Sequence, residues 1–242
     1  MCGIVGVATS EGMLGSTKRM DYFIQALYAD ALRGFDSTGV ALIDKGNVTM
    51  RKRAVQSADF LDSSRFSKML QRNSGAQFYI GHNRKATMGS MGHEGAHPFQ
   101  HGDITMVHNG TLFTHNNLPD GHKFDIDSEA ICHAIDKIGI AETVRLLDGA
   151  FALVWHDQKD NTLNFCRNDK REFSFAHVKG EDTLLYASEM GMLEWLADRN
   201  KIELDNVFSL NPEYHIKMHA DKVLPYTATK MEFRQPPVYK GH

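Results

Sequence analysis

The segment CGIVGVAT, residues 2–9, starts with the cysteine that follows the initiator methionine and continues as an apolar run of small and β-branched residues. An apolar run of this kind predicts a buried strand. The first question that this sequence raises is therefore why a cysteine stands at the beginning of a buried strand.

Cys2 is a candidate nucleophile because of its position. Removal of Met1, which is usual before a small side chain, would give Cys2 both a thiol and a free α-amine. The thiolate is the reactive form of cysteine, and an α-amine with a pKa of about 7.7–8.0 is suited to accept the thiol proton. The alternative is a small core residue, which is the more common role of a single cysteine.

Outward from this strand, the hydrophobic pattern predicts further helices and strands. Helices are expected at residues 16–32, 57–72, 128–147 and 189–198. Strands are expected at 37–43, 47–54, 77–82, 103–108, 150–156, 162–167, 172–178 and 183–187, with more in 203–226. Because the elements come in blocks, the pattern favours an α+β fold of helices on antiparallel sheets. We assign 1–226 to one domain and 227–242 to a polar C-terminal tail.

Composition and charge limit the classes of function. The formal net charge of −3 gives no electrostatic reason to expect nucleic acid or an anionic membrane as a partner. The three cysteines (Cys2, Cys132 and Cys166) do not suggest a disulfide framework and favour a reducing, cytoplasmic location. The N-terminus lacks a signal-peptide pattern, and the longest apolar run, 150–155, is too short to cross a bilayer.

Three further segments carry residue types that suit a polar substrate. Arg84, in GHNRKAT at 81–87, has a guanidinium group that can bind a carboxylate through two hydrogen bonds. Asn109 and Gly110 offer a side-chain amide and a close backbone N–H, which together suit an oxyanion hole. Asp127 precedes a predicted helix and could meet an ammonium group. Each has a plainer alternative: a surface arginine, an Asn-Gly turn and a helix cap.

The histidines raise the question of a metal site. His93, His97 and His101 are spaced by four residues, as ligands on one helix face would be. Gly92, Gly95 and Pro98 make a helix there improbable, so we expect no metal ion.

Taken in order, these segments resemble the class II glutamine amidotransferases of the N-terminal nucleophile hydrolase superfamily. The matching pieces are MCGIVG at 1–6, RGFDSTG at 33–39, GHNRKATMG at 81–89, HPF at 97–99, VHNG at 107–110, DSE at 127–129, GAFAL at 149–153 and ASE at 187–189. RGFDSTG and GHNRKATMG are most similar to the glutaminase part of glucosamine-6-phosphate synthase. The order of the pieces is specific, and it favours the nucleophile interpretation of Cys2.

The resemblance implies a four-layer αββα sandwich, with two mainly antiparallel sheets between helical layers. It implies that Cys2 attacks the side-chain amide of glutamine, forms a γ-glutamyl thioester and releases ammonia, with its α-amine as base and then acid. Asn109 and Gly110 would hold the oxyanion. Arg84 would bind the α-carboxylate of glutamine, and Asp127 would bind its α-ammonium group.

The resemblance also implies supporting residues and partners. Thr87 and His97 would line the substrate loop, while Arg33 and Asp36 would support the N-terminus. An arginine and an aspartate so placed at a turn can also pair with each other. No cofactor is implied. Because no synthase segment follows, ammonia would pass to a separate synthase or acceptor subunit, and a homo-oligomer is compatible with the pattern.

Two segments depart from the family pattern, at the expected pocket rim and in the region expected to face an acceptor, and two other functions are also considered. Lys85 and Met88 stand where relatives often carry other residues, and RNDKREFSF at 167–175 lacks the family's glycine and proline. One alternative is an amidohydrolase of the same fold that acts on another amide or γ-glutamyl substrate. The other is a non-catalytic regulatory relative that retains Met1.

Overall fold

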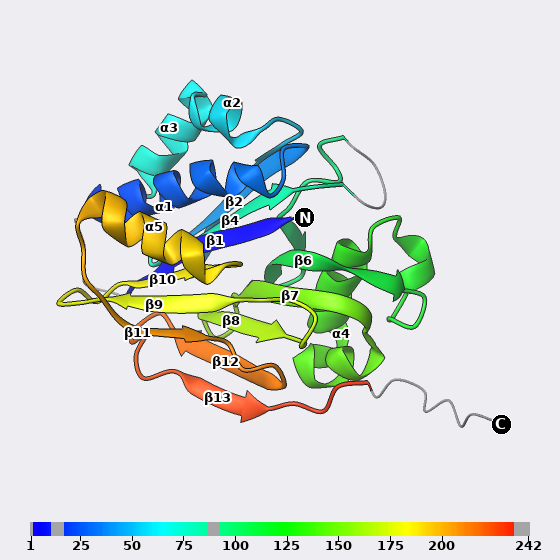
Figure 1. The fold of residues 1–242 in the computed structure, drawn as a ribbon. Helices are drawn as coiled ribbons and strands as arrows, with labels where there is room; N and C mark the ends of the chain where they lie inside the picture. Colours follow the sequence, from blue (N-terminus) through cyan, green and yellow to red (C-terminus); the bar gives the residue numbers. More distant parts are fainter. Residues whose placement is uncertain (1, 11–16, 87–91, 235–242) are drawn as a thin grey trace.

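Two β-sheets stack face to face in the computed structural model, which describes residues 2–10, 17–86 and 92–234 (Figure 1). Neighbouring strands in both sheets are antiparallel. The seven-stranded sheet has the order β11 (Leu204–Ser209), β9 (Ser174–Val178), β10 (Leu184–Ala187), β1 (Gly3–Ala8), β4 (Phe78–Arg84), β2 (Ser37–Asp44), β3 (Asn47–Arg53). The six-stranded sheet has the order β13 (Thr227–Lys230), β12 (Tyr214–His219), β8 (Thr162–Arg167), β7 (Asp148–Asp157), β6 (Ile104–Thr114), β5 (Phe99–His101).

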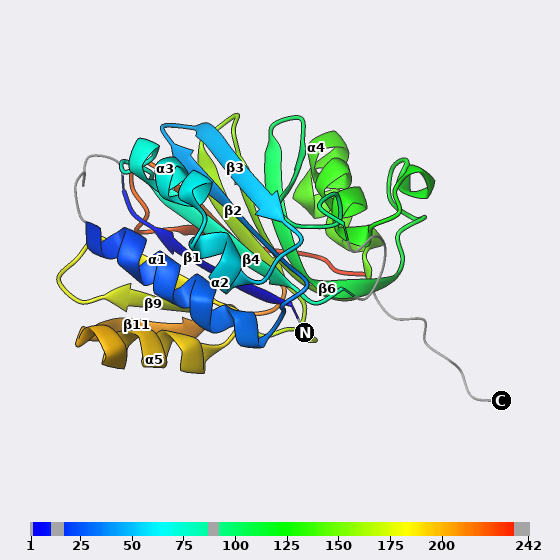
Figure 2. The same ribbon diagram turned by 90° about the horizontal axis from the view of Figure 1, so that it is seen from above.

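Helices cover the outer face of each sheet (Figures 1 and 2). The seven-stranded sheet carries α1 (Thr17–Ala29), the 3-10 helix η1 (Asp30–Leu32), α2 (Ser57–Leu61), α3 (Ser64–Arg72) and α5 (Met190–Asn200). The six-stranded sheet carries α4 (Asp127–Leu146), and the short 3-10 helix η2 (Gly121–Lys123) precedes it. This arrangement confirms the predicted α+β sandwich of four layers.

Three separate apolar cores hold the layers together. Between the two sheets, Ile4 packs with side chains such as Val154 and Phe165 of the opposite sheet. A second core joins the seven-stranded sheet to its helices and includes Val5 and Phe23. The third lies between α4 and the six-stranded sheet. Because Ile4 and Val5 belong to different cores, β1 is buried on both faces, which confirms the buried strand predicted from its apolar sequence.

Two predicted elements differ in detail. The single helix expected at 57–72 is two helices, because Ser63 ends one and caps the next: its hydroxyl donates to the Phe60 carbonyl and accepts from Phe66 N–H at 3.3 Å. The strand expected to end near residue 108 continues to Thr114. Asn109 and Gly110 therefore lie inside β6 rather than in a turn, paired with Ala152 and Phe151 of β7.

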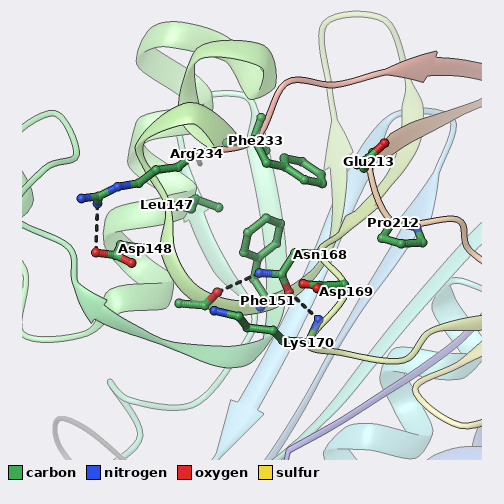
Figure 3. A pocket seen from close by; sticks show the side chains of 12 residues that line it. Leu147, Asp148, Phe151, Asn168, Asp169, Lys170, Pro212, Glu213, Phe233 and Arg234 are labelled. Atoms are coloured by element: carbon green, nitrogen blue, oxygen red, sulfur yellow. Dashed lines mark hydrogen bonds and ion pairs between the residues drawn. The ribbon is translucent and has the colours of Figure 1, made fainter. Parts of the chain in front are cut away.

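The predicted C-terminal tail also differs, since its first residues, Thr227–Lys230, pair with β12 as strand β13. The next residues pack on β7 and α4: Phe233 meets the ring of Phe151 edge to face at 5.7 Å, and Arg234 pairs with Asp148 at 3.0 Å (Figure 3). They close one side of a hollow of about 290 Å³ that none of the predicted site residues lines. In the described ranges, no helix combines the length and apolarity that crossing a bilayer requires.

Candidate active site

Cys2 lies half-buried just before β1, next to the chain that leaves β4. Its Sγ accepts a hydrogen bond from Lys85 N–H at 3.3 Å and lies 3.3 Å from the Lys85 carbonyl oxygen, to which the thiol donates. Burial raises the pKa of the thiol, the positive charge of Arg84 lowers it, and the negative charge of Asp30 raises it further. In this state the thiol is protonated at neutral pH and needs a base to become a nucleophile.

Arg33 contacts Cys2 itself, and Asp36 contacts the residues after β4 that lie beside the thiol. Arg33 Nε donates to the Cys2 carbonyl oxygen at 3.0 Å, and its guanidinium forms an ion pair with Glu189. Asp36 accepts from Ala86 N–H at 2.8 Å and pairs with Lys85 Nζ at 3.4 Å. Arg33 and Asp36 do not pair with each other, because each side chain has an ion-pair partner from another segment. Both nevertheless contact residues that adjoin the thiol.

Asn109, which lies in the six-stranded sheet, is connected to β1 of the other sheet by the hydroxyl group of Ser188. Its Nδ2 donates to Ser188 Oγ at 3.3 Å, and the same oxygen accepts from Ile4 N–H at 2.9 Å. Ser188 N–H in turn donates to the Ile4 carbonyl at 2.9 Å. Asn109, only 2% exposed, is therefore tied to a point two residues from Cys2. The sequence did not single out Ser188, although it lies in the matching segment ASE.

Gly110 follows Asn109 in a place where only glycine fits. A Cβ atom on this residue would lie 1.9 Å from the carbonyl oxygen of Ala150 in β7 and 2.4 Å from His108 Nε2. The β6 backbone is thus packed closely against its neighbour at the point where the predicted oxyanion donor stands. A side chain there would force the two strands apart.

Asp127 and Arg84 are both buried charged residues at the ends of elements. Asp127 is the first residue of α4, and its carboxylate accepts from Leu112 N–H at 2.9 Å and Ser128 N–H at 2.8 Å. Ser128 Oγ also lies 2.9 Å from His108 Nδ1, so β6 and α4 hold each other at this point. Arg84 is the last residue of β4, 4% exposed and adjacent to Lys85.

The ring of His97 stacks on the ring of His82 in β4, with ring centroids 3.9 Å apart. Burial lowers the pKa of His97, and it lowers that of His82 to about 3, so both rings are neutral at pH 7. His82 Nε2 lies 3.0 Å from the His108 carbonyl oxygen, which fixes this ring on β6. Thr87, the other residue predicted in the substrate loop, lies outside the described residues.

The three histidines spaced by four do not form a cluster. His93 Nδ1 accepts from Ala54 N–H at 2.9 Å, whereas His101 pairs with Glu129 at 3.4 Å. Within 2–10, 17–86 and 92–234, no group of three or more potential metal ligands comes together.

A family model described as a glutamine amidotransferase domain matches residues 66–227, about two thirds of the chain. This chain belongs to that family. Its curated relatives include glutamine–fructose-6-phosphate aminotransferase (isomerizing) from Listeria innocua, which is 30% identical over 205 residues and aligns with 78% of this chain. The same enzyme from Shewanella oneidensis is 32% identical over 182 residues, or 66% of this chain. The alignments cover 32% and 27% of those relatives, so the amidotransferase chain spans about a third of their length.

Solved structures share the fold of this amidotransferase domain. Glutamine phosphoribosylpyrophosphate amidotransferase from B. subtilis superposes with a TM-score of 0.71 and 17% identity, over 96% of this chain and 50% of that one. A glutamine aminotransferase class-II domain protein from Silicibacter pomeroyi gives a TM-score of 0.56 and 12% identity, over 97% and 100% of the two chains. At these levels of identity, the likenesses concern the fold alone.

Proposed function

We propose that this domain hydrolyses the side-chain amide of glutamine to glutamate and ammonia, with Cys2 as the nucleophile. The observation that carries the proposal is the link from Asn109 through Ser188 to Ile4, because it joins a predicted oxyanion donor to the strand that bears the thiol. The family match supports the reaction class, and the half-buried thiol supports the choice of nucleophile.

The first half of the reaction forms a thioester. After removal of Met1, the α-amine of Cys2 accepts the thiol proton, and Sγ bonds to the amide carbon of glutamine. The amide oxygen becomes an oxyanion, which the Asn109 side-chain N–H and the Gly110 backbone N–H stabilise. One such donor contributes about 10²–10³ in rate. The α-ammonium group then protonates the leaving nitrogen, and ammonia departs as the C–N bond breaks.

The second half consumes water. The free α-amine takes a proton from a water molecule, whose oxygen attacks the γ-glutamyl thioester carbon. The C–S bond breaks, glutamate is released and the proton returns to the sulfur. The same two donors stabilise the second oxyanion, so one site serves both halves.

Substrate choice rests on two opposite charges. Arg84 binds the α-carboxylate of glutamine through its planar guanidinium, and Asp127 binds its α-ammonium group. Thr87 and His97 complete the substrate loop, and Arg33 and Asp36 support the residues beside the nucleophile. A free amino acid satisfies both charges, whereas an amide within a peptide satisfies neither.

The ammonia that leaves is taken up by an acceptor site outside the described residues. The support is the activity for which the relatives are named, the transfer of an amino group from glutamine to fructose-6-phosphate. Those relatives are about two and a half times as long as this chain. The acceptor of this domain belongs to a synthase domain or subunit.

The decisive experiment measures glutamate and ammonia after incubation of the chain with glutamine, once intact mass has established that Met1 is absent. We expect turnover in the wild type and in Cys166→Ala, a matched control whose thiol is fully buried and whose pKa burial raises to about 12. Cys2→Ala should lose turnover and labelling by a glutamine-mimicking electrophile. Turnover by Cys2→Ala, or an unlabelled Cys2 in the processed wild type, would contradict the proposal.

Arg84 separates glutaminase from the alternative of an amidohydrolase with another substrate. We expect Arg84→Ala to raise KM for glutamine by about 100-fold, the equivalent of a lost charge-assisted contact of about 3 kcal/mol. Arg84→Lys should recover part of the loss. If Arg84→Ala hydrolysed glutamine as the wild type does, the alternative substrate class would be favoured.

A further inference from the structure

The carboxyl group of Asp30 is buried next to Gly3, the residue after the nucleophile. The proposed reaction gives this group no role. It is the first residue of η1 and is 0% exposed. A Cβ atom placed on Gly3 would lie 1.9 Å from Asp30 Oδ1 and 2.2 Å from Oδ2. The carboxyl group therefore occupies the space where a side chain of the residue after Cys2 would stand, and Gly3 is needed for this contact.

Asn83 holds this carboxyl group in its orientation. Asn83 Nδ2 donates to Asp30 Oδ2 at 3.0 Å and to the Leu27 carbonyl at 2.8 Å, while Asn83 Oδ1 accepts from Thr38 Oγ1 at 2.9 Å. Among the described residues, Asp30 Oδ1 has no hydrogen-bond partner. A buried polar atom without a partner is rare in native structures and calls for a functional explanation.

The Cys2 thiol is among the titratable groups on which the charge of Asp30 acts. Burial raises the pKa of Asp30 to about 7, against the opposing effects of Asn83 and of the positive charge of Arg33. The negative charge of Asp30 in turn raises the pKa of Cys2, after the larger effect of burial. Other charged groups that act on Cys2 or on Arg33 come from β4, from the residue before α5 and from the segment after β8: Arg84, Glu189, Arg171 and Glu172.

We propose that Asp30 is a positioning residue for the amidotransferase reaction, seating the first residues of the processed chain and setting, through its charge, the pH at which Cys2 becomes reactive. This inference rests on the proposed function for its biological meaning, but the reactivity of Cys2 can be measured without turnover. An ionised Asp30 disfavours the Cys2 thiolate and favours the protonated α-amine. Both effects keep the nucleophile in its resting form until a higher pH.

The test follows alkylation of Cys2 by iodoacetamide from pH 5 to pH 10 in the processed full chain. Asp30→Asn removes the charge and keeps the shape, so the midpoint of the rate profile should move to lower pH by about 1 unit, the effect of one nearby like charge. Asp21→Asn is the matched control, because Asp21 is an exposed aspartate of α1. Its profile should superimpose on that of the wild type.

A second variant, Asp30→Ala, and a second measurement, the pH dependence of kcat/KM, test the same proposal. Asp30→Ala also lacks the charge and should show the same shift if Asp30→Asn fails to fold. With glutamine, the acidic limb of kcat/KM should move with the alkylation midpoint, while KM at the plateau stays unchanged. A profile of either variant that superimposes on the wild type would overturn the proposal. Alkylation needs no turnover, so an absent glutaminase activity with a shifted profile would refute only the proposed function.

Discussion

Replacing Asp30 by asparagine removes a buried carboxyl group, and the ionisation of this group opposes folding. The pKa of Asp30 is raised by burial from an ordinary value of 3.8 to about 7. The unfolded chain therefore loses this proton near pH 4, and the folded chain keeps it to about pH 7. Because the folded state binds the extra proton in this window, stability falls as pH rises from 4 to 7.

The size of this effect follows from the shift in pKa. Each pKa unit corresponds to about 1.4 kcal/mol, so a rise from 3.8 to about 7 corresponds to about 4 kcal/mol. Asparagine keeps the bond from Asn83 Nδ2 and carries no charge at any pH. The variant and the wild type should be similarly stable at pH 4, and the variant should be more stable by up to about 4 kcal/mol at pH 8.

The assay is urea-induced unfolding at pH 4, 5, 6, 7 and 8, with the free energy of unfolding extrapolated to water. The Asp21→Asn control should differ from the wild type by the same small amount at every pH, because this carboxylate is exposed. A constant difference between Asp30→Asn and the wild type across the series would refute the reasoning, since it would mean that the carboxyl group ionises alike in both states.

Three further substitutions test the site and the fold. Ser188→Ala should lower kcat about 10-fold with little change in KM for glutamine, because Asn109 loses the acceptor that orients it; an unchanged kcat in steady-state assays would contradict this role. Gly110→Ala should lower kcat by at least about 100-fold, because the new Cβ would meet a β7 carbonyl oxygen at 1.9 Å and displace the oxyanion donor; wild-type turnover would refute it. Phe165→Ala should reduce the free energy of unfolding by about 3–5 kcal/mol, because its fully buried ring fills the core between the sheets; a loss below about 1 kcal/mol would contradict the packing.

Elements with a strong hydrophobic pattern could be predicted from the sequence alone. The buried strand at 2–9, the hairpin of β2 and β3 and the helix after residue 189 all follow from periodicity over neighbouring residues. The break at Ser63 was missed because the apolar pattern continues through it, and only the hydrogen bonds of its hydroxyl group show where one helix ends.

Asn109 and Gly110 show a different limit of local reasoning. An Asn-Gly pair by itself is a strong turn signal. The continuation of β6 to Thr114 depends on pairing with β7, which lies some forty residues further along the chain, so no nearby residue could reveal it.

The order of short motifs by itself determined the family, the candidate nucleophile and most of the residues proposed around it. These are properties of residue type and spacing, and a sequence states them directly. Only the tertiary structure decided that Arg33 turns to the Cys2 carbonyl and Glu189, that Ser188 joins Asn109 to Ile4, and that Asp30 lies behind Gly3. Each of these contacts joins residues at least 27 positions apart, and the stacking of two sheets and their helices, not any local pattern, brings them together.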